Sequence, residues 1–343
     1  MRHEVLALGV AIVFAAVSWG DELFTNPVLA QDWPDPALWQ ADGAFYSVAT
    51  GLRTVFRSDN AVDWSDTGVD PLTPDARRKL MSISGHLWAP CVLRLGEEWL
   101  LYVSLFVSDL DCRIEVLSSK SPIGPFEHVG EVVNSRTIGI LNTIDPHVLK
   151  ADGKVWMFFG SCQDGVHRVE LTADGRAVGV GAKPVHVAGL RNPGPSGKKP
   201  YTNIWCKPGT YEGAFLLRRH GWWYLFVSGG KYSDHTYYLT AGRSRTIDGE
   251  FRDRDGFPMT AGVARPILSS EKGDELYGPG HNGEVVTSDD GRDFVFFHCH
   301  DAGRPANERP TFLQELKWTE DAWPSFESGR PRRTERKFRV THH

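Results

Sequence analysis

A short phrase that recurs five times is the feature that most constrains how this chain can fold. Each copy opens on a variable residue and continues into small or apolar residues, and the copies begin 54 to 69 residues apart. A run rich in aromatic residues, such as Trp222–Phe226, follows each copy about ten residues later. The five copies are Asp35–Leu38, Ala89–Val92, Asp145–Val148, Glu212–Phe215 and His281–Glu284. Because a repeat places equivalent positions at equivalent points of a fold, one supersecondary unit is expected to be used five times.

Each unit has the pattern of several short strands separated by Gly, Asp and Pro turns, such as Gln40–Gly43 and Lys150–Gly153. Amphipathic helical spacing is almost absent. Four-stranded units repeated around a centre make a β-propeller, and ring closure removes exposed sheet edges. We therefore predict an all-β, five-bladed β-propeller with a long connection over residues 191–210. A pair of β-sandwiches is the alternative, but it would not explain the periodic first strand.

The N-terminus has the pattern of a secretory signal. Arg2 precedes the uncharged, mostly apolar stretch Val5–Val17, and Ala16–Ser18 offers small residues for cleavage. An uncleaved anchor or a buried strand is the alternative. We predict a signal peptide over residues 1–20, a single propeller domain over 21–343, and a secreted or periplasmic location.

The composition of the chain limits the kinds of partner that it can bind. The net charge of −5 gives no electrostatic footprint for nucleic acid or for an anionic membrane. Tryptophan is abundant, with 12 residues, and solvent-facing indoles suit the apolar faces of sugar rings. We expect a monomer that binds an oligo- or polysaccharide. The five cysteines show no metal-binding spacing, and a Cys91–Cys112 disulfide and buried free thiols both remain open.

In a propeller the first strands of all blades run the same way, so their starts meet at one mouth of the channel. This brings Asp35, Asp145, Glu212 and His281 together. Hydrolysis of a glycoside needs one protonated and one ionised carboxyl group, and neighbouring acids push their pKa values apart. Any single Asp-Pro can instead simply start a strand. Three acids in one repeat frame favour an acid–base site.

The motifs resemble those of glycoside hydrolase family 43, five-bladed propellers that cleave arabinan and xylan linkages. The resemblance runs from Asn26 to about Pro324. It rests on five segments in the family's order: Asn26–Leu29 with Pro34–Pro36, His86–Pro90, Asn142–Pro146, Tyr211–Gly213 and Gly278–Asn282. It implies an inverting mechanism with Asp35 as general base, Glu212 as general acid and Asp145 as the residue that tunes and orients the acid.

The resemblance also implies further site residues and a substrate class. It assigns Trp88, Asn142 and Ser161 to sugar binding, and His281 to a calcium ion in the central channel, held mainly through water; no organic cofactor is implied. An indole such as Trp88 is equally typical of a protein core. The segment Asp255–Met259 and the region near Trp318 and Trp323 favour α-L-arabinofuranosyl linkages, with β-xyloside hydrolysis and non-catalytic sugar binding as alternatives.

Two departures from the family pattern stand near the expected sugar-binding mouth. Cys91 replaces an acid, and Cys162-Gln163 replaces an aromatic pair. Separately, His298 and His300 share one face of a strand, as a metal-binding pair would. A strand leaving the core explains these two histidines better, because no third ligand is apparent.

Overall fold

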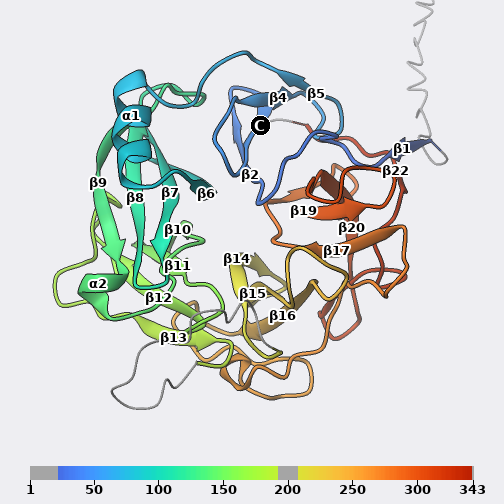
Figure 1. The fold of residues 1–343 in the computed structure, drawn as a ribbon. Coiled ribbons are helices and arrows are strands. Elements are labelled where there is room, and N and C mark those ends of the chain that lie inside the picture. Colours follow the sequence, from blue (N-terminus) through green and yellow to red (C-terminus); the bar gives the residue numbers. More distant parts are fainter. Residues whose placement is uncertain (1–21, 192–207, 342–343) are drawn as a thin grey trace, which may run out of the picture.

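The computed structural model describes residues 22–191 and 208–341. Across these residues, five twisted antiparallel sheets stand in a ring around a central channel (Figure 1). The sheets follow one another around the ring in sequence order. The predicted all-β, five-bladed propeller is confirmed.

Each blade is built from consecutive strands, with the first strand nearest the channel. Blade 1 contains β2 (Ala37–Ala41), β3 (Ala44–Val48), β4 (Phe56–Ser58) and β5 (Trp64–Asp66). Blade 2 contains β6 (Leu87–Leu95), β7 (Glu98–Ser108), β8 (Asp111–Ser119) and β9 (Glu127–Asn134). Blade 3 contains β10 (His147–Ala151), β11 (Lys154–Phe159), β12 (Val166–Leu171) and β13 (Val185–Ala188).

The last two blades vary this plan. In the described part of the chain, blade 4 has three strands: β14 (Glu212–Arg219), β15 (Trp222–Gly229) and β16 (Tyr238–Ser244). Blade 5 comprises β17 (Leu276–Gly280), β18 (Val285–Thr287), β19 (Asp293–Asp301), β20 (Thr311–Trp318) and β21 (Pro324–Ser325). Both β17 and β18 pair with β19, so the inner strand of blade 5 is broken where the repeated phrase begins.

Short helices interrupt the sheets at three points of the described chain: α1 (Pro74–Ile83), α2 (Ser135–Ile138) and the 3-10 turn η1 (Met259–Ala261). Helix α1 is not predicted by the sequence pattern. Its N-terminus is capped because Thr73 Oγ1 accepts a hydrogen bond from Ala76 N, 3.2 Å away. Along α1 only Ala76 and Leu80 are buried, so the helix carries too few apolar positions to show a helical period.

A separate apolar core fills each seam between neighbouring blades. Phe45 of blade 1, for example, shares a core with Phe294 and Phe296 of blade 5. The ring closes there, and β1 (Leu23–Thr25) pairs with β22 (Thr334–Arg336) beside blade 5. The packing of all five seams fixes the blade starts relative to one another.

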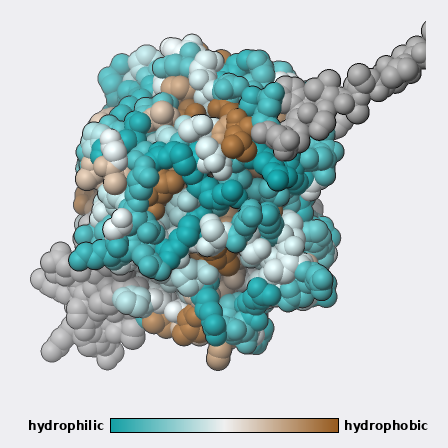
Figure 2. All heavy atoms as spheres, turned by 90° about the vertical axis from the view of Figure 1, so that its right-hand side faces the viewer, coloured by the Kyte–Doolittle hydropathy of each residue, from teal (hydrophilic) through white to brown (hydrophobic). Residues whose placement is uncertain are grey.

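Two sequence predictions fall partly or wholly outside the described residues: the signal peptide over 1–20 and most of the connection over 191–210. Along residues 22–191 and 208–341, no helix is long and apolar enough to span a membrane. The exterior of the face seen in Figure 2 is largely hydrophilic, with hydrophobic side chains in small separate patches.

Candidate active site

The repeated phrase marks a sharp turn of the backbone at the start of each inner strand. Within each copy of the phrase one residue adopts the left-handed region: Asp35 (φ 53°), Ala89 (φ 41°), Asp145 (φ 57°), Gly213 (φ 60°) and His281 (φ 45°). The pairing of β6 with β7 and of β14 with β15 shifts register at this point, as in a β-bulge. The turns re-aim the side chains at the mouth of the ring.

These angles correct the repeat frame in blade 4. The repeat in the sequence predicts that Glu212 is equivalent to Asp35, but Gly213 occupies the left-handed position and Glu212 comes one residue earlier. Glu212 is therefore equivalent to Trp88 of blade 2. Glycine takes the strained backbone position without a steric penalty, so the carboxyl group comes from the residue before it.

Polar groups of each blade hold the start of the next blade. In four seams a side chain accepts a hydrogen bond from the left-handed residue's backbone N–H: Thr50 Oγ1 from Ala89 (2.9 Å), Ser104 Oγ from Asp145 (2.9 Å), Ser228 Oγ from His281 (2.7 Å) and His298 Nδ1 from Asp35 (3.2 Å). In the seam between blades 3 and 4, Ser161 Oγ instead donates to Glu212 Oε2 over 2.9 Å.

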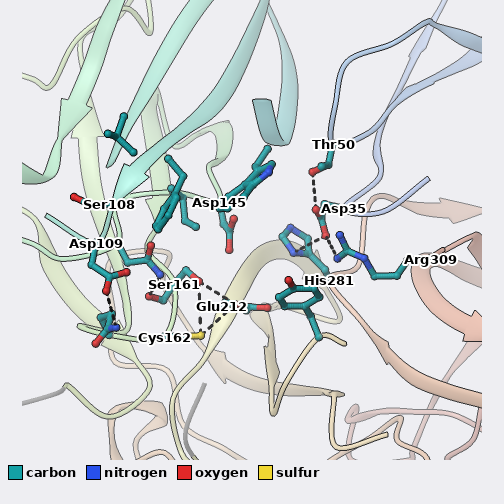
Figure 3. Close-up of a pocket in the computed structure, with 17 residues that line it drawn as sticks. Asp35, Thr50, Ser108, Asp109, Asp145, Ser161, Cys162, Glu212, His281 and Arg309 are labelled. Atoms are coloured by element: carbon teal, nitrogen blue, oxygen red, sulfur yellow. Dashed lines mark hydrogen bonds and ion pairs between the residues drawn. The ribbon is translucent and has the colours of Figure 1, made fainter. Parts of the chain in front are cut away.

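A pocket of about 430 Å³ lies at this mouth, within the usual size range for small-ligand sites (Figure 3). Asp35, Asp145, Glu212 and His281 all line it, each from a different blade. Trp88, Asp109, Ser161 and Gln163 also line the pocket.

Asp35 is buried among cationic and hydrogen-bonding groups. Its Oδ2 accepts a hydrogen bond from Thr50 Oγ1 at 2.6 Å. Its Oδ1 lies 3.2 Å from Arg309 Nη1, 3.2 Å from His298 Nδ1 and 3.3 Å from His281 Nδ1. Burial by itself would raise the pKa of Asp35, but Arg309, with His281, holds this pKa well below the usual range. The carboxyl group is therefore ionised.

Burial also lowers the pKa of His298, to about 3, and the nearby Arg309 adds to the effect. The imidazole of His298 is neutral across the neutral pH range. It packs parallel to the ring of Tyr237, at 5.5 Å between centroids. Tyr237 thus links the surroundings of Asp35 to those of Glu212.

Among the described residues, Tyr237, Ser161 and Cys162 contact the carboxyl group of Glu212. Tyr237 Oη donates a hydrogen bond to its Oε1 over 2.6 Å, Ser161 Oγ donates to Oε2 over 2.9 Å, and Cys162 Sγ lies 3.2 Å from the same Oε2. Burial raises the pKa of Glu212 despite these donors and His281. Burial also raises the pKa of Asp145, to about 7, with the charges of Glu212 and Asp35 adding to the effect. One pocket therefore contains an ionised carboxylate and two carboxyl groups that favour a proton.

The three predicted sugar-binding residues all line the pocket, but they differ in what they offer to a ligand. Trp88 is partly buried and stacks on Phe106, at 5.0 Å between ring centroids. Asn142 is buried and its Nδ2 donates to Ser161 O over 2.9 Å. Asn142 and Ser161 therefore direct hydrogen bonds to the protein rather than into the pocket.

The tip of the β7–β8 hairpin forms one wall of the pocket with Phe106, Val107, Ser108 and Asp109. Gln163 Nε2 donates to Asp109 Oδ2 over 3.3 Å, and burial raises the pKa of Asp109. Hydroxyl groups of a sugar are suited to this carboxyl–amide pair. The Gln163 departure from the family pattern thus lies in the pocket, as expected.

The departure at Cys91 lies elsewhere. Cys91 lines the central channel below the pocket, a cavity of about 210 Å³, and its Sγ accepts a hydrogen bond from Val148 N at 3.3 Å. The expectation that this residue stands near the sugar-binding mouth is wrong, because it lies two residues past the left-handed turn, inside the channel.

The cysteines of the described chain differ in state. Cys91, Cys112 and Cys299 are buried free thiols, so the Cys91–Cys112 disulfide is not formed. Cys162 is disulfide-bonded. Its side chain is buried beside the carboxyl group of Glu212 (Figure 3).

The residues around His281 do not fit a directly bound metal ion. Throughout residues 22–191 and 208–341, no cluster of three or more His, Cys, Asp or Glu side chains could hold one. His281 Nδ1 is turned toward Asp35. A calcium ion held only through water stays a prediction, and no chemical step is assigned to it. His298 and His300 do not act as a pair either, since His300 Nε2 lies 2.9 Å from Tyr232 O.

Four residues in contact with the acids were missed as site residues by the sequence analysis: Thr50, Tyr237, His298 and Arg309. Only His298 gave a signal, through its alternation with His300. Arg309 lies 274 residues from Asp35 in the chain, and no local pattern links the two.

The sequence and fold are similar to those of known arabinan-degrading proteins. The chain is 28% identical over 312 residues to the extracellular exo-α-(1→5)-L-arabinofuranosidase ArbA of Cellvibrio japonicus, covering 85% of this chain and 86% of the relative. It is 27% identical to arabinan endo-1,5-α-L-arabinosidase A of Aspergillus niger, covering 73% of this chain and 76% of that protein.

The solved structure of Cellvibrio cellulosa α-L-arabinanase complexed with arabinohexaose superimposes with a TM-score of 0.71 and 28% identity, covering 87% of this chain and 96% of that one. The family model for glycosyl hydrolases family 43 matches residues 24–324. The protein therefore belongs to glycosyl hydrolases family 43.

Proposed function

We propose that this protein is a glycosidase that hydrolyses α-L-arabinofuranosyl linkages, in arabinan or arabinose-decorated hemicellulose, with inversion at the anomeric carbon. The observation that carries the proposal is that Asp35 and Glu212 line one pocket, where Arg309 lowers the pKa of Asp35 despite its burial and burial raises the pKa of Glu212. The names of the similar proteins, which include exo- and endo-acting arabinan enzymes, support the substrate class.

In the proposed reaction Asp35 removes a proton from water, and that water attacks the anomeric carbon. Glu212 donates its proton to the departing sugar oxygen as the glycosidic bond breaks. One turnover leaves Asp35 protonated and Glu212 ionised, and exchange with solvent restores both. An inverting site needs a spacing between the two carboxyl groups of about 6.5–9.5 Å, which we predict for Asp35 and Glu212.

Asp145 is proposed to tune and orient the acid. Its carboxyl group lies in the same pocket, and its negative form would raise the pKa of Glu212 further. The aromatic surface of Trp88 and Phe106 would cover the apolar face of the sugar. Asn142 and Ser161 are proposed to support the site from behind.

We also propose that the protein is exported and acts as a monomer. The disulfide at Cys162 is typical of proteins that fold in an oxidising compartment. The similar Cellvibrio japonicus protein is described as extracellular.

The proposal is tested with purified Glu212→Gln and Asp35→Asn variants beside the unchanged protein. Each variant should lower kcat by at least about 100-fold, the order of a lost acid or base, while circular dichroism shows a retained fold. The substrates are p-nitrophenyl arabinofuranoside, p-nitrophenyl xyloside and debranched arabinan. Near-normal rates in either variant would overturn the assignment.

The same assay separates the alternatives. Faster turnover of the xyloside than of both arabinose substrates would identify a β-xylosidase. Binding of pentose polymers without any turnover would identify a carbohydrate-binding propeller. A proton NMR time course on the preferred substrate shows whether the product first appears with inverted configuration.

A further inference from the structure

We propose that a groove at the outer rim of the seam between blades 4 and 5 is a second carbohydrate-binding site, which holds arabinofuranose residues of the polymer that the active site cleaves. The choice of polymer rests on the proposed function. The groove has a volume of about 430 Å³, as large as the active-site pocket, and no described residue lines both. Its lining includes residues of β16 and β21, which are the outermost strands of the two blades in the described chain.

The groove combines a buried apolar lining with an exposed polar rim. Ala241, Trp323 and Phe326 line it and are buried. Arg254 and Arg265 line it as well and are exposed. Ligand sites in proteins commonly have this composition, in which apolar and aromatic side chains supply the contact area and a few polar groups fix the orientation. It suits a sugar, because a sugar ring has an apolar face and an edge of hydroxyl groups.

One buried oxygen in the groove has no partner in the described part of the protein. Asp253 is 4% exposed, and its Oδ1 accepts a hydrogen bond from Phe257 N over 2.8 Å. Among the described residues, Oδ2 of the same carboxyl group accepts no hydrogen bond. A buried oxygen without a partner is destabilising, so it requires a donor from water or from a ligand. Because Asp253 lines the groove, a hydroxyl group bound there can be that donor.

The residues that would contact the sugar are held in place by the protein itself. Asp253 N donates a hydrogen bond to Phe257 O over 2.8 Å, so the turn from 253 to 257 is closed at its backbone and at its side chain. Trp323 N donates to Thr319 Oγ1 over 2.9 Å, and the guanidinium group of Arg243 lies 4.2 Å from the centroid of the Trp323 ring. A site that is already formed loses less conformational entropy when a ligand binds.

The charges around the groove favour a neutral ligand. Asp253, Asp255, Arg254 and Arg265 line it, so two negative and two positive formal charges cancel. Arg265 Nε pairs with Asp255 Oδ2 over 2.8 Å. The two arginines disfavour a metal cation, and the two carboxyl groups disfavour a phosphate or another anion. Carboxyl oxygens accept from hydroxyl groups and guanidinium groups donate to them, so a ligand rich in hydroxyl groups satisfies both.

A second contact with the polymer has a consequence for catalysis. A polysaccharide held at the groove stays near the protein between cleavage events, so its linkages meet the active-site pocket at a higher effective concentration. A glycoside of a single sugar gains nothing from the groove. Asp255 and Trp323, from the two sequence segments that favour arabinofuranosyl linkages, both line the groove and not the pocket. The groove should therefore matter for arabinan and not for p-nitrophenyl arabinofuranoside.

Binding is tested by affinity gel electrophoresis of the Glu212→Gln protein in gels that contain debranched arabinan, xylan or no polymer. Arg265→Ala removes an exposed donor, and Asp253→Asn replaces the unpartnered oxygen while the bond from Phe257 N is kept. Each change should raise the dissociation constant for arabinan about threefold or more, the order of one lost hydrogen bond. Arg57→Ala is the matched control, because Arg57 is also in a surface ion pair, with Asp59 at 2.6 Å, and does not line the groove. Its dissociation constant should not change.

The outcomes separate this inference from the proposed function. No retardation by arabinan, or equal retardation of Arg265→Ala and Arg57→Ala, would overturn the second site. Weaker retardation of Arg265→Ala by xylan alone would overturn its assignment to arabinan. With Glu212 intact, the ratio of kcat/KM on debranched arabinan to kcat/KM on p-nitrophenyl arabinofuranoside should fall about threefold in Arg265→Ala, and an unchanged ratio contradicts the proposal. If Glu212→Gln still hydrolyses arabinan while the groove variants bind it weakly, the proposed function fails and the second site stands.

Discussion

At the scale of single residues, two buried carboxyl groups of the site have pKa values that are shifted in opposite directions. Asp35 and Glu212 are both buried, and burial by itself raises the pKa of either carboxyl group. The difference comes from the neighbours, since Arg309 lies beside Asp35 whereas neutral hydroxyl groups and a disulfide sulfur touch Glu212. Among the groups that lower the pKa of Asp35, Arg309 has the largest effect, which favours Asp35 as the candidate base.

Replacing Arg309 by Gln should raise the pKa of Asp35. The base acts in its ionised form, so a higher pKa moves the acidic limb of kcat/KM to higher pH, and we expect a shift of about one unit. Activity lost at low pH should return as the pH rises. The pH profile on p-nitrophenyl arabinofuranoside measures this shift. Arg309→Lys keeps the charge and should keep the limb, and an unmoved limb in Arg309→Gln would contradict the electrostatic account.

At the scale of the structural element, the bend at the start of each inner strand aims the site residues. In β14 this bend is made by Gly213, where an added Cβ would lie 3.0 Å from the ring of His281. His281 in turn lies 3.3 Å from Asp35. The backbone of blade 4 therefore sets the position of a group that contacts the candidate base of blade 1.

Gly213→Ala should push His281 away from Asp35 and lower kcat/KM by about tenfold or more, as expected when a supporting group shifts by a fraction of an ångström. Gly153→Ala is the matched control, because Gly153 also has a positive φ (78°) but nothing lies within 4 Å of an added Cβ. Both variants should lose stability by roughly 1 kcal/mol from backbone strain. Equal activities in the two variants would rule out the contact with His281 as the cause.

At the scale of the whole molecule, the closing pair β1–β22 contains a buried acid. Glu335 of β22 pairs with Phe24 of β1, only 3% of it is exposed, and burial raises its pKa to about 7. A raised carboxyl pKa means that the folded state prefers the protonated form. The stability that this group supplies is complete below its unfolded pKa of about 4.3 and is lost as the pH rises through 7.

Glu335→Gln should therefore stabilise the protein at pH 8 and leave its stability nearly unchanged at pH 5. We expect a gain on the order of 1 kcal/mol at pH 8, after allowing for screening by nearby water. Thermal unfolding followed by circular dichroism at both pH values measures the difference. A gain of the same size at both pH values would show that the effect is not due to ionisation.

Much of the molecule could be predicted from its sequence because the blade is a local unit. The repeated phrase and the aromatic strand after it gave the blade order, and the acids in that phrase gave three lining residues of the pocket. The one-residue offset of Glu212 in blade 4 could not be predicted, because either Glu212 or Gly213 can be aligned with the first residue of the repeated phrase. Arg309 contacts Asp35 across the seam between blades 5 and 1, and Tyr237 contacts Glu212 within blade 4 from 25 residues away. Neither contact leaves a recognisable spacing in the sequence.

The hydrogen bonds that run from each blade to the start of the next have a consequence for how such a protein can be inherited. Asp35 belongs to the first blade, and its backbone N–H donates a hydrogen bond to His298 of the last blade. Glu212 belongs to the fourth blade, and its carboxyl group accepts a hydrogen bond from Ser161 of the third. Copying or exchanging one blade transfers a side chain without the partner that aims it. A working site can therefore be passed on only with nearly the whole chain, as one heritable unit.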